Sequence, residues 1–180
     1  MKREKSQIHG ICFVGFLSPR HVALKAVILM HQEILYYFEM GKYNKFRLHW
    51  GDETGQVIAT GIICREKRGS TNIQMIESSR IVNLEHTPRR LLLISPKTTF
   101  SINGHKYRWI GDSNVFENKT NCLVGQYYAN LARGEEDKIG TLLLREGKNE
   151  LTHMVVISAL VLQARSIKHN HAVFHVTFLC

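Results

Sequence analysis

The chain has ten histidines, which are candidate metal ligands because a neutral imidazole commonly binds metal ions. Three of them, His169, His171 and His175, lie close together in the segment HNHAVFH. No His-Glu-x-x-His spacing and no paired Cys-His spacing accompanies them, although zinc sites usually draw on such a set. The sequence therefore predicts no metal site, and the segment is typical of a polar linker that runs into an edge strand.

Motifs for nucleophilic catalysis or phosphate binding are also missing. The segment GDSNVFENKT has Gly111 near its start and Lys119 near its end, as a phosphate loop would. However, it lacks the glycine before the lysine, and its spacing is too long. No Gly-x-Ser-x-Gly motif occurs, and the carboxylates of RGEEDK are typical of a solvated turn. We therefore expect no catalytic residue, no cofactor and no enzymatic activity.

Basic side chains remain as candidates for a site. The chain has 24 Lys and Arg residues against 15 Asp and Glu residues, a net charge of +9 and a pI near 9.6. Such a balance favours encounters with anionic partners, either phospholipid headgroups or nucleic acid. The candidates are Arg65, Lys67 and Arg68 in CREKRGS, Arg89 and Arg90 in TPRR, and Lys97, Lys106 and Arg108 around FSINGHKYRWIG. An ordinary charged exterior is the alternative interpretation of the same residues.

The segment FSINGHKYRWIG predicts the element that positions three of these candidates. Asn103-Gly104 between two alternating segments is a strong signal for a hairpin with a two-residue type I′ turn. In that register Phe100 faces Tyr107 and Thr98 faces Trp109, so the large apolar side chains share one face. The other face has Lys97, Thr99, Ser101, Lys106 and Arg108.

Around this hairpin the 180 residues predict one globular unit with a sizeable core. Alternating apolar residues predict strands in YNKFRLHW, QVIATGIICRE, NIQMIE, RIVNL, LLLIS, CLVGQYYANLA and GTLLLRE. No helical segment separates them. A meander of this length must close into a barrel or fold into a sandwich to protect its edges.

Two segments on either side of the strands have helical features. Residues 18–41 combine Ser18, Pro19 and a final Gly41 with an apolar stripe at helical spacing, which predicts one long N-terminal helix. The middle of residues 151–166, LTHMVVISALVLQARS, is apolar on every side from Met154 to Leu162 and is interrupted only by Ser158. A segment this short does not span a membrane, so we expect a helix that the strands surround.

The N-terminal residues imitate a signal peptide, with a basic MKREKSQIHG before the apolar ICFVGFL. The following Ser18-Pro19-Arg20-His21 offers no cleavage pattern, so we expect an intracellular protein, cytoplasmic or peripheral to a membrane, with secretion as the alternative. Four cysteines are spread far apart with no Cys-x-x-Cys pair, which indicates buried free thiols.

The order of TFSINGHKYRWIG, an acidic-turn hairpin and IGTLLLREGKNELTHMVVISALVLQ resembles the tubby C-terminal-like fold, and in particular a fungal family of unknown function assigned to it. The match to a Phe-x-x-x-Gly-x-x-Tyr-x-Trp pattern rests on Phe100, Gly104, Tyr107 and Trp109. It covers roughly residues 43–166. The resemblance implies a closed antiparallel barrel of about twelve strands around the hydrophobic C-terminal helix.

These observations predict a mainly β fold with helices, divided into three parts. They are an N-terminal extension with a long helix (1–41), a tubby-like barrel domain (42–167) and a C-terminal tail (168–180). The leading functional hypothesis is a non-enzymatic domain that associates with anionic phospholipid or phosphoinositide, since relatives of the fold include phosphoinositide-binding proteins. A basic module that binds nucleic acid or protein is the alternative. Nucleic-acid binding requires exposed aromatic side chains among the basic ones.

Overall fold

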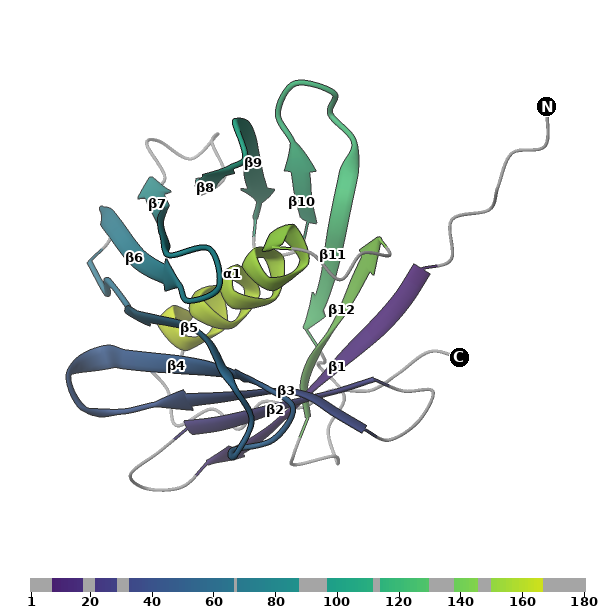
Figure 1. Ribbon diagram of the computed structural model, residues 1–180. Helices are drawn as coiled ribbons and strands as arrows, with labels where there is room; N and C mark the ends of the chain where they lie inside the picture. Colours follow the sequence, from purple (N-terminus) through teal and green to yellow (C-terminus); the bar gives the residue numbers. More distant parts are fainter. Residues whose placement is uncertain are drawn as a thin grey trace.

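In the residues that it describes, the computed structural model of the chain has twelve β-strands and one long α-helix; Figure 1 shows their arrangement. The structure describes residues 8–17, 22–28, 33–66, 68–87, 97–111, 114–129, 138–145 and 150–166. The strands are β1 (Ile8–Leu17), β2 (Val22–Ile28), β3 (Glu33–Met40), β4 (Lys45–Trp50), β5 (Val57–Ile62), β6 (Gly69–Met75), β7 (Arg80–Thr87), β8 (Lys97–Ile102), β9 (His105–Ile110), β10 (Asn114–Glu117), β11 (Leu123–Ala129) and β12 (Lys138–Arg145). The helix is α1 (Glu150–Ser166), and a short 3₁₀ turn, η1, spans Lys42–Asn44.

All the strand pairs in the described part of the chain are antiparallel. The strands follow chain order from β2 to β12, and β1 pairs with β2 on one side and with β12 on the other. This nearest-neighbour order is expected of short connections between consecutive strands. The predictions of a mainly β, antiparallel fold and of a C-terminal helix are confirmed.

Helix α1 lies in the middle of the strands (Figure 1). All residues from 154 to 164 are buried, which means that no side of this part of the helix faces solvent. Each fully buried Val, Leu, Ile or Met side chain contributes roughly 1.5–3 kcal/mol to folding. Within the described residues, no helix combines the length and the apolar character needed to cross a membrane.

One polar pair joins the helix to the sheet inside this apolar core. The Trp109 indole donates a hydrogen bond from Nε1 to Ser158 Oγ at 3.0 Å, and the Ser158 hydroxyl donates to the Val155 carbonyl oxygen at 3.0 Å. Both side chains are fully buried. The single hydroxyl in the middle of the helix thus satisfies the indole N–H, which would otherwise be left without a partner in the core.

The hairpin predicted at Asn103-Gly104 is confirmed in its position and its register. Phe100 pairs with Tyr107, and Thr98 pairs with Trp109. Both turn residues have positive φ, 50° and 76°, as a type I′ turn requires. The Phe100 and Tyr107 rings stack with centroids 5.2 Å apart on the buried face.

The helix predicted within residues 18–41 is wrong, because the described part of this segment forms β2 and β3. In β3, Tyr36 and Phe38 are buried while Tyr37 and Glu39 are only half-buried, which is the alternation of a strand. Aromatic and β-branched residues favour a strand once a partner is present, and β4 pairs with β3 along five residues from Tyr36 to Met40. Gly41 begins the turn to β4 and does not end a helix.

Strands β1 to β3 pair into the same sheet as the later strands. Strand β10 was not predicted, since its four residues lie between turn-like segments. The predicted strand LLLIS, the acidic RGEEDK turn apart from its last residue, and the tail at 168–180 lie outside the described residues, as do Arg89, Arg90 and the histidine cluster.

Both ends of α1 are tied to strand connections. At the N-terminal end, Ser78 donates to the Glu150 carboxylate, and Arg80 Nη1 lies 3.7 Å from Glu150 Oε2. At the C-terminal end, Arg165 donates to the carbonyl oxygens of Cys64 and Glu66. The helix is therefore held in its axial position by hydrogen bonds at both ends and in the middle.

A buried histidine lies near the second of these ends. Thr71 Oγ1 is 3.1 Å from His86 Nε2, and Thr98 Oγ1 is 3.2 Å from His86 Nδ1. Burial lowers the pKa of His86 to about 4, and the charge of Arg165 acts in the same direction. His86 is therefore neutral in the folded protein at pH 7.

We predict that Ser158→Ala lowers the free energy of unfolding by about 1–3 kcal/mol, because the Trp109 indole N–H remains buried without an acceptor. Urea unfolding measures the effect. In a Trp109→Phe background the same serine change is expected to cost much less, since no donor is left to satisfy. Equal costs in the two backgrounds would mean that the hydrogen bond contributes little.

We also predict that the free energy of unfolding decreases as the pH falls from about 6.5 to about 4. Over this range the unfolded chain protonates His86 near its ordinary pKa, whereas the folded protein does not, so the unfolded state binds more protons and stability rises with pH. The variant His86→Gln, measured by urea unfolding across this range, is expected to have a shallower pH dependence. The same slope in both proteins would show that His86 does not contribute.

Candidate functional site

The basic residues predicted on the hairpin do lie on its outer face. Lys97 and Lys106 are exposed, and they pair in register with Ile110 and Ser101, at opposite ends of the hairpin. The Arg108 guanidinium between them is already engaged. It donates to Asn118 Oδ1 at 2.9 Å and to Asn121 Oδ1 at 2.6 Å. Arg108 therefore holds the turn after β10 against β9.

The second predicted basic group lies in the connection from β5 to β6. Arg65 is half-buried, and its Nε has no hydrogen-bond partner among the described residues; Arg68 is exposed; and Lys67 lies outside the described residues. Arg68 directly precedes β6, whose first residue pairs with β7 beside Lys97. Arg68 and Lys97 thus lie near the same ends of their strands, with β7 between them. Lys106 lies at the other end of the hairpin, beside its turn.

A concave surface lies away from these basic residues, over the outer faces of β3 to β7. It is a hollow of about 1040 Å³, which we call the outer hollow. One row of paired residues crosses it from strand to strand: Glu39, Arg47, Thr60, Gln74 and Ile81. A second row contains Lys45, Ile62 and Asn72. Because neighbouring strands lie about 4.8 Å apart, the first row spans roughly 19 Å.

The turn η1 closes one end of the outer hollow. The Gly41 N–H donates to the Lys45 carbonyl oxygen at 2.8 Å, and the Ile63 N–H donates to the Asn44 carbonyl oxygen at 2.9 Å. Tyr43 and Asn44 both have φ of 60°, in the left-handed region, which asparagine tolerates but which costs a residue such as tyrosine about 1–2 kcal/mol. The turn is thus fastened to the ends of β4 and β5, and the Tyr43 side chain stays in solvent.

Positive charge dominates this hollow. Lys42, Lys45 and Arg47 line it together with one carboxylate, that of Glu39. Arg47 Nη1 is 3.1 Å from Glu39 Oε1, and neither lysine has an ion pair within the described part of the chain. The two lysines are exposed and free to bind an anion.

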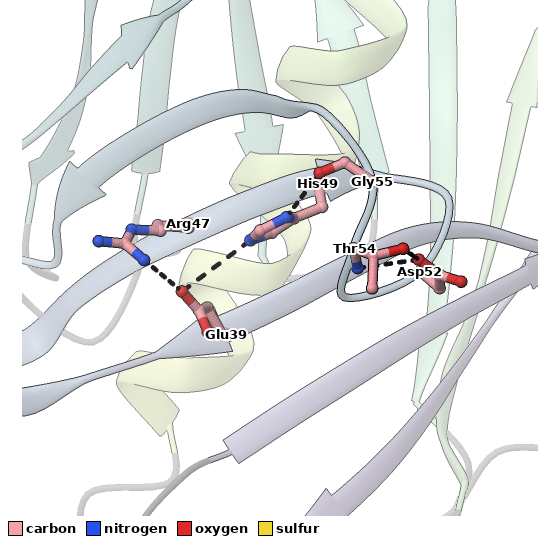
Figure 2. A network of polar contacts seen from close by, with 6 residues as sticks. All are labelled: Glu39, Arg47, His49, Asp52, Thr54 and Gly55. Carbon is pink, nitrogen blue, oxygen red and sulfur yellow. Dashed lines mark hydrogen bonds and ion pairs between the residues drawn. The ribbon is translucent and has the colours of Figure 1, made fainter.

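Figure 2 shows how the single carboxylate is held. Arg47 Nη1 donates to Glu39 Oε1 at 3.1 Å, while the His49 Nε2 on the other side is 3.9 Å away and has no hydrogen-bond partner in the described structure, so His49 pairs with this carboxylate only when its ring is protonated. The His49 Nδ1 is 3.0 Å from the Gly55 carbonyl oxygen, which can only accept, so the proton of the neutral ring is on Nδ1. The loop around Asp52 and Thr54 covers this ring, with Thr54 donating from its N–H and its hydroxyl to Asp52 Oδ1.

The outer hollow also collects exposed apolar side chains. Of the large apolar residues exposed in the described part of the chain, the three most exposed are Tyr43 at 84%, Ile81 at 69% and Ile62 at 54%, and all three line this hollow. Single exposed apolar residues are ordinary, but several on one concave, basic surface indicate an interaction site.

Glycine at position 61 lies on the buried face of β5, where it pairs with the buried Phe46. A Cβ at this position would lie 2.5 Å from the Asn72 carbonyl oxygen and 2.6 Å from the Phe46 ring. No side chain fits between the strand backbone and this ring. Gly61 therefore allows the β5 backbone to pack directly on the Phe46 ring, on the face opposite Thr60 and Ile62.

A second hollow, of about 420 Å³, lies near the start of α1. His105 Nδ1 contacts Glu117 Oε1, and hydrogen bonds from Thr120 and then from His105 lower the pKa of the Glu117 carboxyl. The exposed Cys122 thiol lines the same hollow, but no hydrogen bond joins it to His105 in the described structure. An activated nucleophile needs such a base within reach, so these residues do not form a catalytic pair as they stand.

No group of three or more His, Cys, Asp or Glu side chains that could hold a metal ion occurs among the described residues. Comparisons with protein-family models, with curated proteins and with solved structures gave no match. The outer hollow, with its exposed lysines and apolar side chains, is therefore the feature of the molecule that indicates a function.

The sequence contained a partial signal for this surface. The alternation in YNKFRLHW places Lys45 and Arg47 on the polar side of a predicted strand. It could not indicate that Ile62 and Ile81 lie beside them, because those residues come from β5 and β7 and meet β4 only across the sheet.

Proposed function

We propose that this protein is a non-enzymatic β domain that binds anionic phospholipid headgroups at the outer hollow. The observation that supports this function is the pair of exposed lysines, Lys42 and Lys45, that have no ion pair in the described structure and border a concave surface with apolar side chains. A phosphorylated headgroup has the charge that these ammonium groups would neutralise.

We propose for the fold a closed barrel of the tubby C-terminal-like kind. Its support is the pairing of β1 with both β2 and β12, together with a helix that is buried on all sides. Closure removes exposed strand edges, and it gives the apolar helix a complete cover. In such a barrel every polar strand face is directed outward, where a membrane-peripheral protein would meet a headgroup.

Single-stranded nucleic acid is the second candidate ligand, and Tyr43 between two lysines is the observation that favours it. Bases stack on exposed aromatic rings, usually on several in succession. The hairpin aromatics Phe100, Tyr107 and Trp109 are buried and cannot serve. Ile62 and Ile81 offer aliphatic surface, which suits acyl chains better than bases.

We predict that the double variant Lys42→Gln/Lys45→Gln binds vesicles that contain phosphatidylinositol bisphosphate about tenfold more weakly than the unmodified protein. Each lost charge at roughly 6 Å in water is worth about 0.7 kcal/mol. Vesicle sedimentation at low and physiological salt measures the change. The proposal requires that binding by the unmodified protein persist at physiological salt, where the Debye length is about 8 Å.

The matched control is Lys97→Gln/Lys106→Gln, which removes the same charge from the outer face of the hairpin. It is expected to change vesicle binding by less than twofold. If both double variants lose binding equally, the net charge of +9 acts without a specific site. If only the control loses binding, the site is on the hairpin.

A gain of affinity provides a test that misfolding cannot mimic. Among the described residues that line the outer hollow, Glu39 is the only one with a carboxylate, and Glu39→Gln removes this charge and releases Arg47, so we predict about threefold tighter binding to the same vesicles. The control Glu85→Gln makes the same change in net charge on the outer face of β7, outside the hollow. An equal gain in both variants would point to net charge alone.

A further inference from the structure

We propose that the outer hollow is a membrane-docking surface, in which the Tyr43 ring enters the headgroup layer while Lys42 and Lys45 bind the lipid phosphate. This inference rests on the proposed function and adds to it the physical state of the ligand. The partner is a bilayer surface rather than a free phosphorylated molecule.

The backbone directs Tyr43 outward. Two consecutive residues in the left-handed region, Tyr43 and Asn44, make a tight turn whose neighbours are bonded to β4 and β5. The ring is the most exposed large apolar side chain in the described part of the chain. A rigid turn loses little conformational entropy when its ring is inserted, so the apolar contact contributes fully to binding.

Two aliphatic side chains extend the same apolar surface. Ile62 and Ile81 pair with Asn72 and Gln74, which are two residues apart on β6 and point to the same side. The isoleucines therefore flank β6, separated by about 10 Å across the sheet and about 7 Å along it. Tyr43 precedes β4, in which Lys45 pairs with Ile62, so the ring and this isoleucine lie at the same end of the hollow.

The combination of groups matches a membrane interface. Tyrosine has an apolar ring and a polar hydroxyl, which suits it to the headgroup level. Lysines near the surface of an anionic bilayer each contribute attraction, and their aliphatic stems can lie along the apolar region while the ammonium groups stay in water. Lys42 and Lys45 flank the Tyr43 ring in the chain, which places positive charge where lipid phosphates would surround an inserted ring.

The test compares a ligand in a bilayer with the same headgroup in solution. We would measure vesicle binding by sedimentation, with vesicles of phosphatidylcholine that contain about 5% phosphatidylinositol bisphosphate. This low fraction of anionic lipid keeps the surface potential of the vesicles moderate. Binding of soluble inositol trisphosphate would be measured by calorimetry. The variant is Tyr43→Asn, because asparagine tolerates the left-handed backbone at this position. The control is Tyr128→Asn, an exposed tyrosine on β11 that does not line the hollow.

We expect Tyr43→Asn to weaken vesicle binding at least about fivefold and to leave inositol trisphosphate binding unchanged, since the ring contributes by burying apolar area in the bilayer. Lys42→Gln/Lys45→Gln is expected to weaken both. Unchanged vesicle binding by Tyr43→Asn, with both ligands weakened by the lysine variant, would overturn the insertion and leave the proposed function standing. If the lysine variant weakened neither ligand, the proposed function itself would fail.

Two further readouts separate the remaining explanations. Tyr43→Trp adds an indole whose emission, after subtraction of the signal of the unmodified protein, is expected to shift to shorter wavelength with vesicles and to be quenched by brominated lipid. An unshifted, unquenched signal in bound protein overturns the insertion. Tighter binding of a single-stranded oligonucleotide than of vesicles, lost in Tyr43→Asn, would assign the ring to base stacking instead.

Discussion

The middle of helix α1 is apolar on all sides, and the need to cover it determines most of what surrounds it. A helix with no polar face cannot lie on the surface of a sheet without leaving apolar side chains in water. Here residues 154–164 are all buried, and the strands lie around them. The hydrogen bond from Trp109 to Ser158 sets the rotational position of the helix, because the only hydroxyl in its middle must face the indole.

This arrangement separates the scaffold from the candidate site. The aromatic side chains of the hairpin point inward and stabilise the contact with α1, so they are not available to a ligand. Their strand neighbours point outward and are free to differ without disturbing the core. The same alternation on β4 buries Phe46 and Leu48 and leaves Lys45 and Arg47 in the outer hollow.

A charged side chain on the outer face of the strands forms a binding site only where it is unpaired, borders a concave surface and lies beside exposed apolar side chains. Arg108 has the charge of a ligand-binding residue, but two asparagine side chains already accept its hydrogen bonds. Lys42 and Lys45 lie beside a concave surface, have no ion pair in the described structure and adjoin exposed apolar side chains. An anionic bilayer supplies both phosphate and apolar contact, which is why it accounts for this surface better than a purely ionic partner would.

Two local elements with strong signals could be predicted from the sequence. Asn103-Gly104 predicted the hairpin and its register, because few residues accept positive φ at both turn positions, and the all-round apolar pattern at 151–166 predicted a helix buried by strands. For residues 18–41 the sequence pattern predicted a helix, and this prediction is wrong. Their apolar spacing suits a helix as well as two strands, and only pairing with β4 decides for strands. Tertiary structure alone decided the outer hollow, since its residues come from η1 and five strands and meet through the ladder of the sheet. No local pattern in the chain encodes that meeting, because it depends on which strand lies beside which.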